Sequence, residues 1–306
     1  MTKLGTTELD IFGLDLGCNV FGYTADEPTS FAVLDAYTGA GGNFLDTANT
    51  YGGGGGSETI IGKWLAARGR RDDVVIATKV GMGDQRPGLS AANIARSVEE
   101  SLRRLQTDHI DLYYAHKDDP GTPQEETLAA FDGLVRAGKV RHIAASNFTA
   151  DRLASALSIS DRQGLARYVA LQPHYNLVER DYEKELAPLV ARENLTTLPY
   201  FGLAKGFLTG KYRSKDQPGD SPRAPRALEY LDARGERVLA VLDEVAAAHG
   251  VSVTSVSLAW LRVQPTVAAP IASARTPEQL TDLLASVSLE LTGDELAALG
   301  GASTVQ

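Results

Sequence analysis

The sequence predicts an α/β fold, a single (β/α)₈ barrel with a short N-terminal β-hairpin and extra C-terminal helices. Eight short apolar segments alternate with segments of helical periodicity, the pattern of a parallel sheet covered by helices. The 306 residues suit one such barrel. No linker, low-complexity block or repeat of 20–50 residues interrupts them. We therefore expect one domain over residues 1–306, with a doubly wound open sheet as the competing arrangement.

The first half of the chain supplies the hairpin and four strand–helix units. Residues 1–12 are expected to form the hairpin, with Gly5-Thr6-Thr7-Glu8 as its turn. Pro28 suits a first helical turn, and Ser57 is a candidate N-cap. The expected strands are Gly13–Gly17, Asn43–Thr47, Val74–Lys79 and Ile110–Ala115. The expected helices are Asp26–Gly39, Ser57–Arg68, Ser90–Leu105 and Pro123–Ala137.

The second half continues the alternation and contains one long exception. Residues 213–231 are too long and polar for a simple connection, so we expect a loop over the barrel mouth. The expected strands are Arg141–Ala145, Val169–Gln172, Thr196–Tyr200 and Val267–Ile271. The expected helices are Thr149–Leu157, Asp181–Glu193, Ala233–His249, Val253–Val263 and Pro277–Ser286.

Composition argues against several classes of function. The net charge of −9 disfavours nucleic acid and anionic membranes as partners, so an anionic ligand needs a local basic patch. Cys18 is the only cysteine, which excludes an internal disulfide. The N-terminus lacks an apolar signal core, and no apolar run approaches the roughly 18 residues of a membrane helix. We expect a cytoplasmic protein.

Polar residues at three consecutive strand ends carry the functional hypothesis. Asp46, Lys79 and His116 end the second, third and fourth expected strands, and Tyr51 follows in the next loop. In a barrel the loops after the strands surround the functional face, so these side chains should meet there. Each alone has an ordinary explanation, such as an Asx turn, a solvated lysine, a structural histidine or loop packing. Their joint occurrence favours a site.

The chemistry of such a cluster is specific. A phenol with a pKa near ~10 is a poor proton donor at neutral pH. A nearby ammonium lowers that pKa, and a carboxylate keeps the ammonium charged and aimed. Tyr51 would then act as a general acid toward an oxygen that gains negative charge, while His116 orients that oxygen.

Three motifs resemble those of the aldo-keto reductases. They are Leu45-Asp46-Thr47-Ala48 with Tyr51-Gly52, Ala77-Thr78-Lys79, and Leu112-Tyr113-Tyr114-Ala115-His116. The resemblance runs from Leu4-Gly5 to Gln279-Leu280. It implies a (β/α)₈ barrel that reduces a small carbonyl substrate with NADPH and no metal. It also implies that Tyr51 is the proton donor, that Lys79 and Asp46 tune it, and that His116 orients the carbonyl.

The resemblance also implies a set of residues that contact NADP, with NADPH preferred over NADH. Ser146, Asn147 and Gln172 would meet the nicotinamide carboxamide, and Tyr200 its ring. The pyrophosphate would lie along Gly202, Leu203, Lys205, Gly206 and Lys211. The adenosine end would meet Ser273, Arg275 and Gln279, with Arg275 on the 2′-phosphate. Asp46, Cys18, Asn19 and Phe201 complete the set of candidate contacts.

The chain departs from the family pattern at three places. Phe201-Gly202 stands where Ser-Pro is usual, and Leu283 where an asparagine commonly contacts adenine. Cys18 and Asn19 replace the usual threonine and a bulkier residue.

Two alternative functions remain open. The first is an NADP-binding sensor or regulatory subunit of the same fold. The second is a barrel lyase or isomerase that uses Lys79 as a Schiff-base or proton-transfer residue. The sequence has no Gly-x-Gly-x-x-Gly after a strand and no phosphate-binding Gly-x₄-Gly-Lys-Ser/Thr motif, and its five histidines are scattered, which disfavours a metal site. Neither the substrate nor the oligomeric state can be read from these residues.

Overall fold

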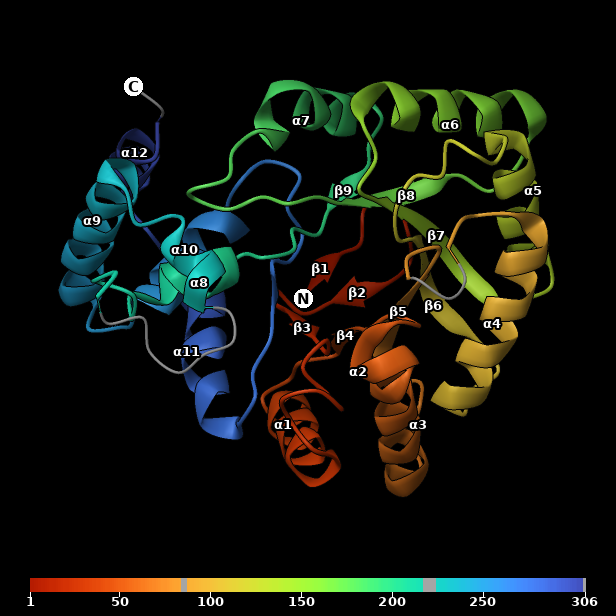
Figure 1. Cartoon of the computed structure of the whole chain (residues 1–306), viewed down its shortest axis with the longest axis horizontal. Coiled ribbons are helices and arrows are strands. Elements are labelled where there is room, and N and C mark those ends of the chain that lie inside the picture. Colours follow the sequence, from red (N-terminus) through yellow and green to blue (C-terminus); the bar gives the residue numbers. More distant parts are fainter. Residues whose placement is uncertain (84–86, 217–223, 305–306) are drawn as a thin grey trace.

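Eight parallel strands curl into a barrel-like sheet with helices around it (Figure 1). The computed structural model describes residues 1–83, 87–216 and 224–304. In sheet order the strands are β10 (Ile271–Ala272), β3 (Asp15–Gly17), β4 (Phe44–Asp46), β5 (Val75–Val80), β6 (Ile110–Ala115), β7 (Val140–Ser146), β8 (Tyr168–Gln172) and β9 (Thr196–Thr197). Ala268 N donates to Thr197 O at 3.0 Å and Ile271 N to Pro199 O at 2.9 Å, which joins the two ends of the sheet. The arrangement confirms the (β/α)₈ class.

The expected N-terminal hairpin is also present. Strands β1 (Thr2–Lys3) and β2 (Asp10–Ile11) pair antiparallel. Leu4, Leu9 and Ile11 are buried in the same apolar cluster as the barrel residues Val75 and Leu112. The hairpin therefore covers the end of the barrel at which the strands begin, and the other end is left for a site.

The helices form a ring around the sheet. In chain order they are α1 (Glu27–Gly39), α3 (Gly56–Arg68), α4 (Ala91–Leu105), α5 (Gln124–Arg136), α6 (Ala150–Gln163), α7 (Tyr182–Arg192) and α11 (Pro277–Ser288). Side-chain caps at Asp26, Ser90 and Thr149 satisfy a backbone N–H at the starts of α1, α4 and α6. From α1 to α7 each of these helices packs against the next, and α11 packs against α1.

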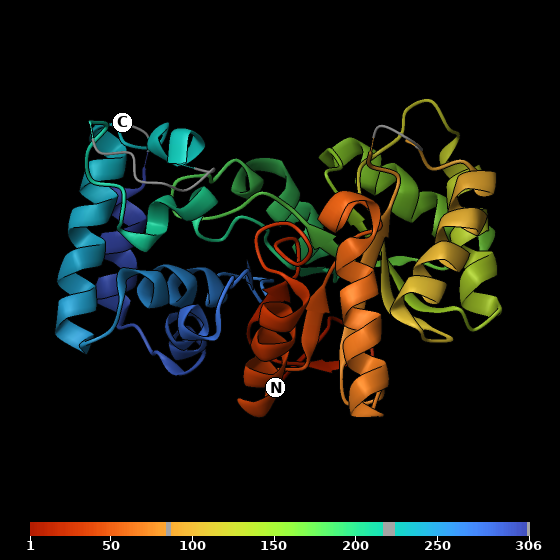
Figure 2. The same cartoon turned by 60° about the horizontal axis from the view of Figure 1, so that its bottom comes forward.

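The extra C-terminal helices gather on one side of the barrel, in cyan to blue in Figure 2. They are α9 (Ala233–His249), α10 (Val253–Arg262) and α12 (Gly293–Ala302). Helix α9 packs against both α10 and α12. Among the described residues no single helix is long and apolar enough to cross a membrane. One pair bent by 99°, α9 with α10, meets those requirements only when joined.

Two expectations about local structure are wrong. Ser57 lies inside α3 and does not cap it, because its hydroxyl accepts from Thr47 Oγ1 and donates to Cys18 O, each at 2.8 Å. The eighth strand is Ile271–Ala272 and not Val267–Ile271. Pro270 within the expected range has no N–H to donate to a ladder, and Val267 forms only an isolated bridge to Thr197.

Three short helical segments lie where none is expected. They are α2 (Tyr51–Gly54), the 3₁₀ segment η1 (Ala204–Thr209) and α8 (Ala224–Leu228). Helix α8 occupies part of the expected mouth loop, of which residues 217–223 lie outside the described ranges. The single domain and the covering role of residues 213–231 stay predictions.

Strand alternation decides which side chains face the barrel interior. Phe44, Ala77 and Tyr114 belong to the apolar cluster inside the barrel. Residues two positions further along a strand point the same way. Asp46, Lys79 and His116 therefore face inward at the carboxyl ends of β4, β5 and β6.

Candidate active site

A buried ion pair forms the floor of the site. Lys79 Nζ binds the Asp46 carboxylate and donates to Thr47 O at 2.7 Å, and its side chain is fully buried. Gln172 Nε2 donates to the second Asp46 oxygen at 2.8 Å. Burial is the largest single effect and would lower the pKa of Lys79. The charge of Asp46 and its hydrogen bond, together with the charges of Tyr51 and Asp15, outweigh burial, so the pKa is raised. The pair therefore holds a charged, immobile ammonium below the cavity.

Tyr51 reaches this ammonium from α2. Lys79 Nζ lies 4.9 Å from the centroid of the Tyr51 ring. The turn behind Tyr51 requires glycine, because Gly52 has φ 67° and a Cβ there would lie 2.7 Å from Phe21 O. The orientation of the Tyr51 side chain thus depends on the packing of the backbone at Gly52 as well as on the Lys79 ammonium.

The expected lowering of the Tyr51 pKa is wrong in direction. Burial raises this pKa, the positive charge of Lys79 opposes the rise, and the charge of Asp46 adds to it. The net pKa is above the ordinary value of a tyrosine because desolvation of the phenolate is the largest effect. Tyr51 therefore carries its proton at neutral pH.

His116 follows β6 and packs edge-on against Tyr51, with ring centroids 5.9 Å apart and an interplanar angle of 80°. It is 6 % exposed. Burial, aided by the charge of Lys79, lowers the pKa of His116 to about 3. The imidazole is therefore neutral near pH 7, with one N–H to donate.

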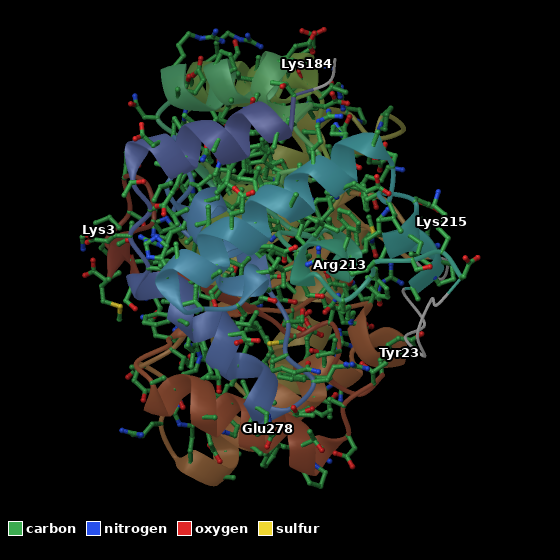
Figure 3. The ribbon with its side chains drawn as sticks, turned by 90° about the vertical axis from the view of Figure 1, so that its left-hand side faces the viewer. Lys3, Tyr23, Lys184, Arg213, Lys215 and Glu278 are labelled. Atoms are coloured by element: carbon green, nitrogen blue, oxygen red, sulfur yellow. The ribbon has the colours of Figure 1, made fainter. Side chains whose placement is uncertain are left out.

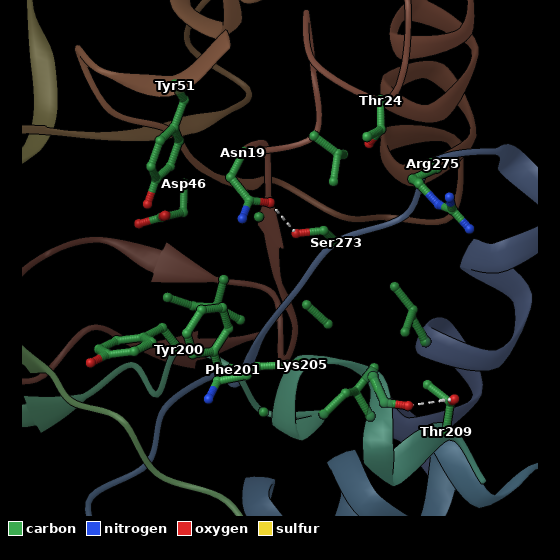
Figure 4. A pocket seen from close by; sticks show the side chains of 18 of the residues that line it. Asn19, Thr24, Asp46, Tyr51, Tyr200, Phe201, Lys205, Thr209, Ser273 and Arg275 are labelled. Carbon is green, nitrogen blue, oxygen red and sulfur yellow. Dashed lines mark hydrogen bonds between the residues drawn. The ribbon is translucent and has the colours of Figure 1, made fainter. Parts of the chain in front are cut away.

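A cavity of about 1010 Å³ opens above these residues. Tyr51 and Asp46 lie on one side of it, Tyr200 and Phe201 on the opposite side, and Arg275 lies at the far end (Figure 4). The sequence-predicted residues that line it are Asn19, Asp46, Tyr51, His116, Ser146, Asn147, Gln172, Tyr200, Phe201, Gly202, Leu203, Lys205, Gly206, Lys211, Ser273, Arg275 and Gln279.

Two predicted residues do not line the cavity. Lys79 and Cys18 are both fully buried behind its wall. The Cys18 thiol donates to Leu16 O at 3.2 Å, so the structure does not bring it to the expected cofactor contact. Lys79 is separated from the cavity by Tyr51, whose ring centroid lies 4.9 Å from its ammonium nitrogen.

One wall of the cavity is a hydrogen-bonded network at the ends of β7 and β8. Ser146 Oγ donates to Gln172 O at 2.9 Å. Asn147 Nδ2 donates to His116 O at 2.9 Å, and Asn147 Oδ1 accepts from the Tyr200 hydroxyl at 2.8 Å. These contacts fix the orientation of each side chain before any ligand arrives.

The cavity carries the basic side chains that an acidic chain needs for an anionic ligand. Lys205, Lys211, Arg226 and Arg275 line it. The only acidic lining residues within the described ranges are Asp46, which is already paired, and Asp282. Lysine and arginine side chains suit phosphate oxygens.

The residues that the resemblance implies for the adenosine end are hydrogen-bonded in two pairs. Ser273 Oγ donates to Asn19 Oδ1 at 2.8 Å, and Arg275 N donates to Gln279 Oε1 at 2.9 Å. Leu283, the departure from the usual asparagine, lines the same region. The cavity therefore offers basic side chains to the phosphates of a dinucleotide.

Sequence reasoning missed several lining residues, among them Tyr23, Met82, Thr24, Arg226 and Thr254. They lie on loops or on helices of the C-terminal group. Loop residues carry no periodic signal, and their approach to the site depends on tertiary packing. Only the glycines on either side of Met82 hinted at a special turn.

The fold and the site define a class of protein, a (β/α)₈ barrel with a tyrosine, lysine, aspartate and histidine cluster at the mouth of a large cavity. The model of the Aldo/keto reductase family matches residues 14–303. The chain is 38% identical to the uncharacterized oxidoreductase YrpG of Bacillus subtilis over 97% of this chain and 94% of that protein. It is 35% identical to the aldo-keto reductase YhdN of the same organism, over 92% and 87% of the two chains.

A third relative is norsolorinic acid reductase stcV of Emericella nidulans, 35% identical over 88% of this chain and 70% of that protein. The chain belongs to the aldo/keto reductase family. It is thus an oxidoreductase that acts on carbonyl groups, from a family that generally uses NADH or NADPH.

Proposed function

We propose that this chain reduces an aldehyde or ketone with NADPH, or catalyses the reverse oxidation of an alcohol, with Tyr51 as the proton donor. The observation that carries the proposal is the contact of Tyr51 with a buried, paired ammonium at the wall of a cavity that four basic side chains line. When bound, the reduced nicotinamide supplies a hydride to the carbonyl carbon.

Tyr51 is well placed to protonate the carbonyl oxygen. Its raised pKa keeps the proton on the phenol until the oxygen gains negative charge. Lys79 has three N–H donors, and two of them bind Asp46 and Thr47. The third supports stabilisation of the phenolate that forms.

His116 orients the carbonyl in this proposal. A neutral imidazole beside Tyr51 donates an N–H to the same oxygen without adding a positive charge. This division of roles leaves Tyr51 as the only group of the cluster that gives up a proton.

The remaining lining residues would hold the cofactor. Ser146, Asn147 and Gln172 would meet the carboxamide, and Tyr200 would stack on the nicotinamide ring. Lys205 and Lys211 would neutralise the pyrophosphate. Arg275 would bind the 2′-phosphate, which would make NADPH the preferred cofactor.

The test follows NADPH oxidation against a panel of aldehydes, ketones and sugars, with NADPH binding measured separately by fluorescence titration. The proposal predicts carbonyl-dependent oxidation and tighter binding of NADPH than of NADH. NADPH binding without turnover on any carbonyl would contradict the proposed reaction.

A further inference from the structure

Three large apolar side chains stay exposed at one cavity. Tyr23, Met82 and Phe201 are 71%, 37% and 36% exposed, and all three line the cavity that contains Tyr51. The other exposed large apolar residues of the described ranges are Met1 and Val263, neither of which lines it. Apolar surface that gathers at one cavity indicates a place where a ligand covers it.

The loop that carries Tyr23 packs against the residue after Tyr51. Tyr23 N donates to Val20 O at 3.2 Å, and Gly22 N donates to Ala25 O at 2.9 Å, so the backbone of the loop is fixed. A Cβ on Gly22 would lie 3.6 Å from Gly52 Cα. Figure 3 shows Tyr23 near the edge of the molecule. The backbone of the loop is hydrogen-bonded within the loop, yet the side chain of Tyr23 is exposed.

The loop that carries Met82 packs against the residue before Tyr51. Met82 stands between Gly81 and Gly83, whose φ angles are 103° and 128°. A Cβ on Gly83 would lie 2.8 Å from Thr50 Cγ2. The residues before and after Tyr51 each contact a loop, and each of these loops carries an exposed apolar side chain.

Phe201 supplies apolar surface from the opposite side of the cavity (Figure 4). Its φ of 52° is unfavourable for a residue with a Cβ, and Asn176 Nδ2 holds its carbonyl at 2.9 Å. Its ring packs edge-on against Tyr200, with centroids 5.2 Å apart. These contacts thus stabilise the strained backbone conformation and hold the Phe201 ring at the wall of the cavity.

We propose that the substrate is an aromatic aldehyde or ketone, whose ring packs against Tyr23 and Met82 while its carbonyl meets Tyr51. The inference rests on the proposed function and adds the substrate class. An aromatic ring and a thioether favour a flat π surface through edge contacts and sulfur–aromatic contacts. Tyr23 and Met82 are then specificity residues and take no part in the proton transfer.

The experiment compares kcat/KM for benzaldehyde, hexanal and glyceraldehyde with saturating NADPH. The variants are Tyr23→Ser, Met82→Ser and the matched control Val263→Ser, which also removes an exposed apolar side chain but away from the cavity. We expect wild type to prefer benzaldehyde. We expect Tyr23→Ser and Met82→Ser each to lower kcat/KM for benzaldehyde by about tenfold, mostly through KM, with little change for glyceraldehyde. Val263→Ser should match wild type.

Each other outcome has a distinct meaning. Turnover of glyceraldehyde as efficient as that of benzaldehyde, or equal losses on both substrates in the two variants, overturns the substrate class and leaves the proposed function standing. Equal efficiency with hexanal and benzaldehyde overturns the aromatic preference. Absence of turnover on all three aldehydes, with folding confirmed by circular dichroism, contradicts the proposed function and this inference with it.

Discussion

The stability of Asp15→Asn relative to wild type is expected to increase as the pH rises. Asp15 lies on β3 inside the barrel, fully buried, and neither of its carboxyl oxygens has a hydrogen-bond partner among the described residues. Burial raises the pKa of Asp15 well above its usual range, the charge of Asp46 raises it further, and Lys79 opposes the rise. The folded protein therefore holds the acid in its neutral form, whereas the unfolded chain ionises near pH ~4.

The sign and the size follow from proton linkage. A group with a raised pKa contributes full stability below its unfolded pKa and loses it as the pH rises toward the folded pKa. In that interval the loss is about 1.4 kcal/mol per pH unit. Between its unfolded and its folded pKa the wild type should therefore lose stability with each pH unit, and Asp15→Asn should keep it. The amide that Asp15→Asn introduces also lacks a hydrogen-bond partner, which changes the free energy of unfolding by an amount that does not depend on pH.

The assay is urea unfolding of wild type, Asp15→Asn and the control Asp72→Asn over that pH range, with Asp72 chosen because it is exposed. The difference in free energy of unfolding between Asp15→Asn and wild type should grow steadily with pH. The same difference for Asp72→Asn should stay nearly constant. A pH-independent difference for Asp15→Asn would refute the reasoning, since it would mean that Asp15 ionises equally in both states.

Three further predictions concern the site. Arg275→Ala should weaken NADPH binding by roughly 1.5–3 kcal/mol and NADH binding little, because a charge-assisted hydrogen bond is lost; equal losses in a fluorescence titration would reject the 2′-phosphate contact. Lys79→Met and Asp46→Asn should each lower turnover strongly, and the double variant should lose far less than the product of the two losses, because coupled residues are not additive; fully multiplicative losses would mean that the two act independently. His116 should be neutral throughout the range between pH 5 and 8, since its pKa is about 3. The pH profile of kcat should then lack a step from His116 in that range, and a step that disappears in His116→Asn would show a charged imidazole.

The sequence predicted the parts of the fold that depend on short-range patterns. The alternation that buries Phe44 and Ala77 also turns Asp46 and Lys79 inward two residues later, so their strand-end positions could be foreseen. The boundaries that failed are those decided by tertiary contacts. The Ser57 hydroxyl is hydrogen-bonded to Cys18 and Thr47, which lie outside its helix. A capping rule that considers only neighbouring residues cannot predict such contacts.

The candidate site was predictable to the same extent. Residues at strand ends, such as Gln172, line the cavity, as their place at the carboxyl ends of the strands predicts. The loop residues Tyr23 and Met82 reach the site because glycines let two loops pack against the neighbours of Tyr51, a property of the folded chain. The direction of the Tyr51 pKa also needed the structure, because burial competes with the charge of Lys79.

The most direct test of the account is the turnover of Tyr51→Phe with NADPH and an aldehyde that the wild type reduces. Loss of the phenolic proton should cut kcat by roughly 10²–10⁴-fold, the usual contribution of a general acid. NADPH binding should stay nearly unchanged, because the ring remains in place beside His116 and Lys79. Near-normal turnover in this variant would contradict the assignment of Tyr51 as the proton donor.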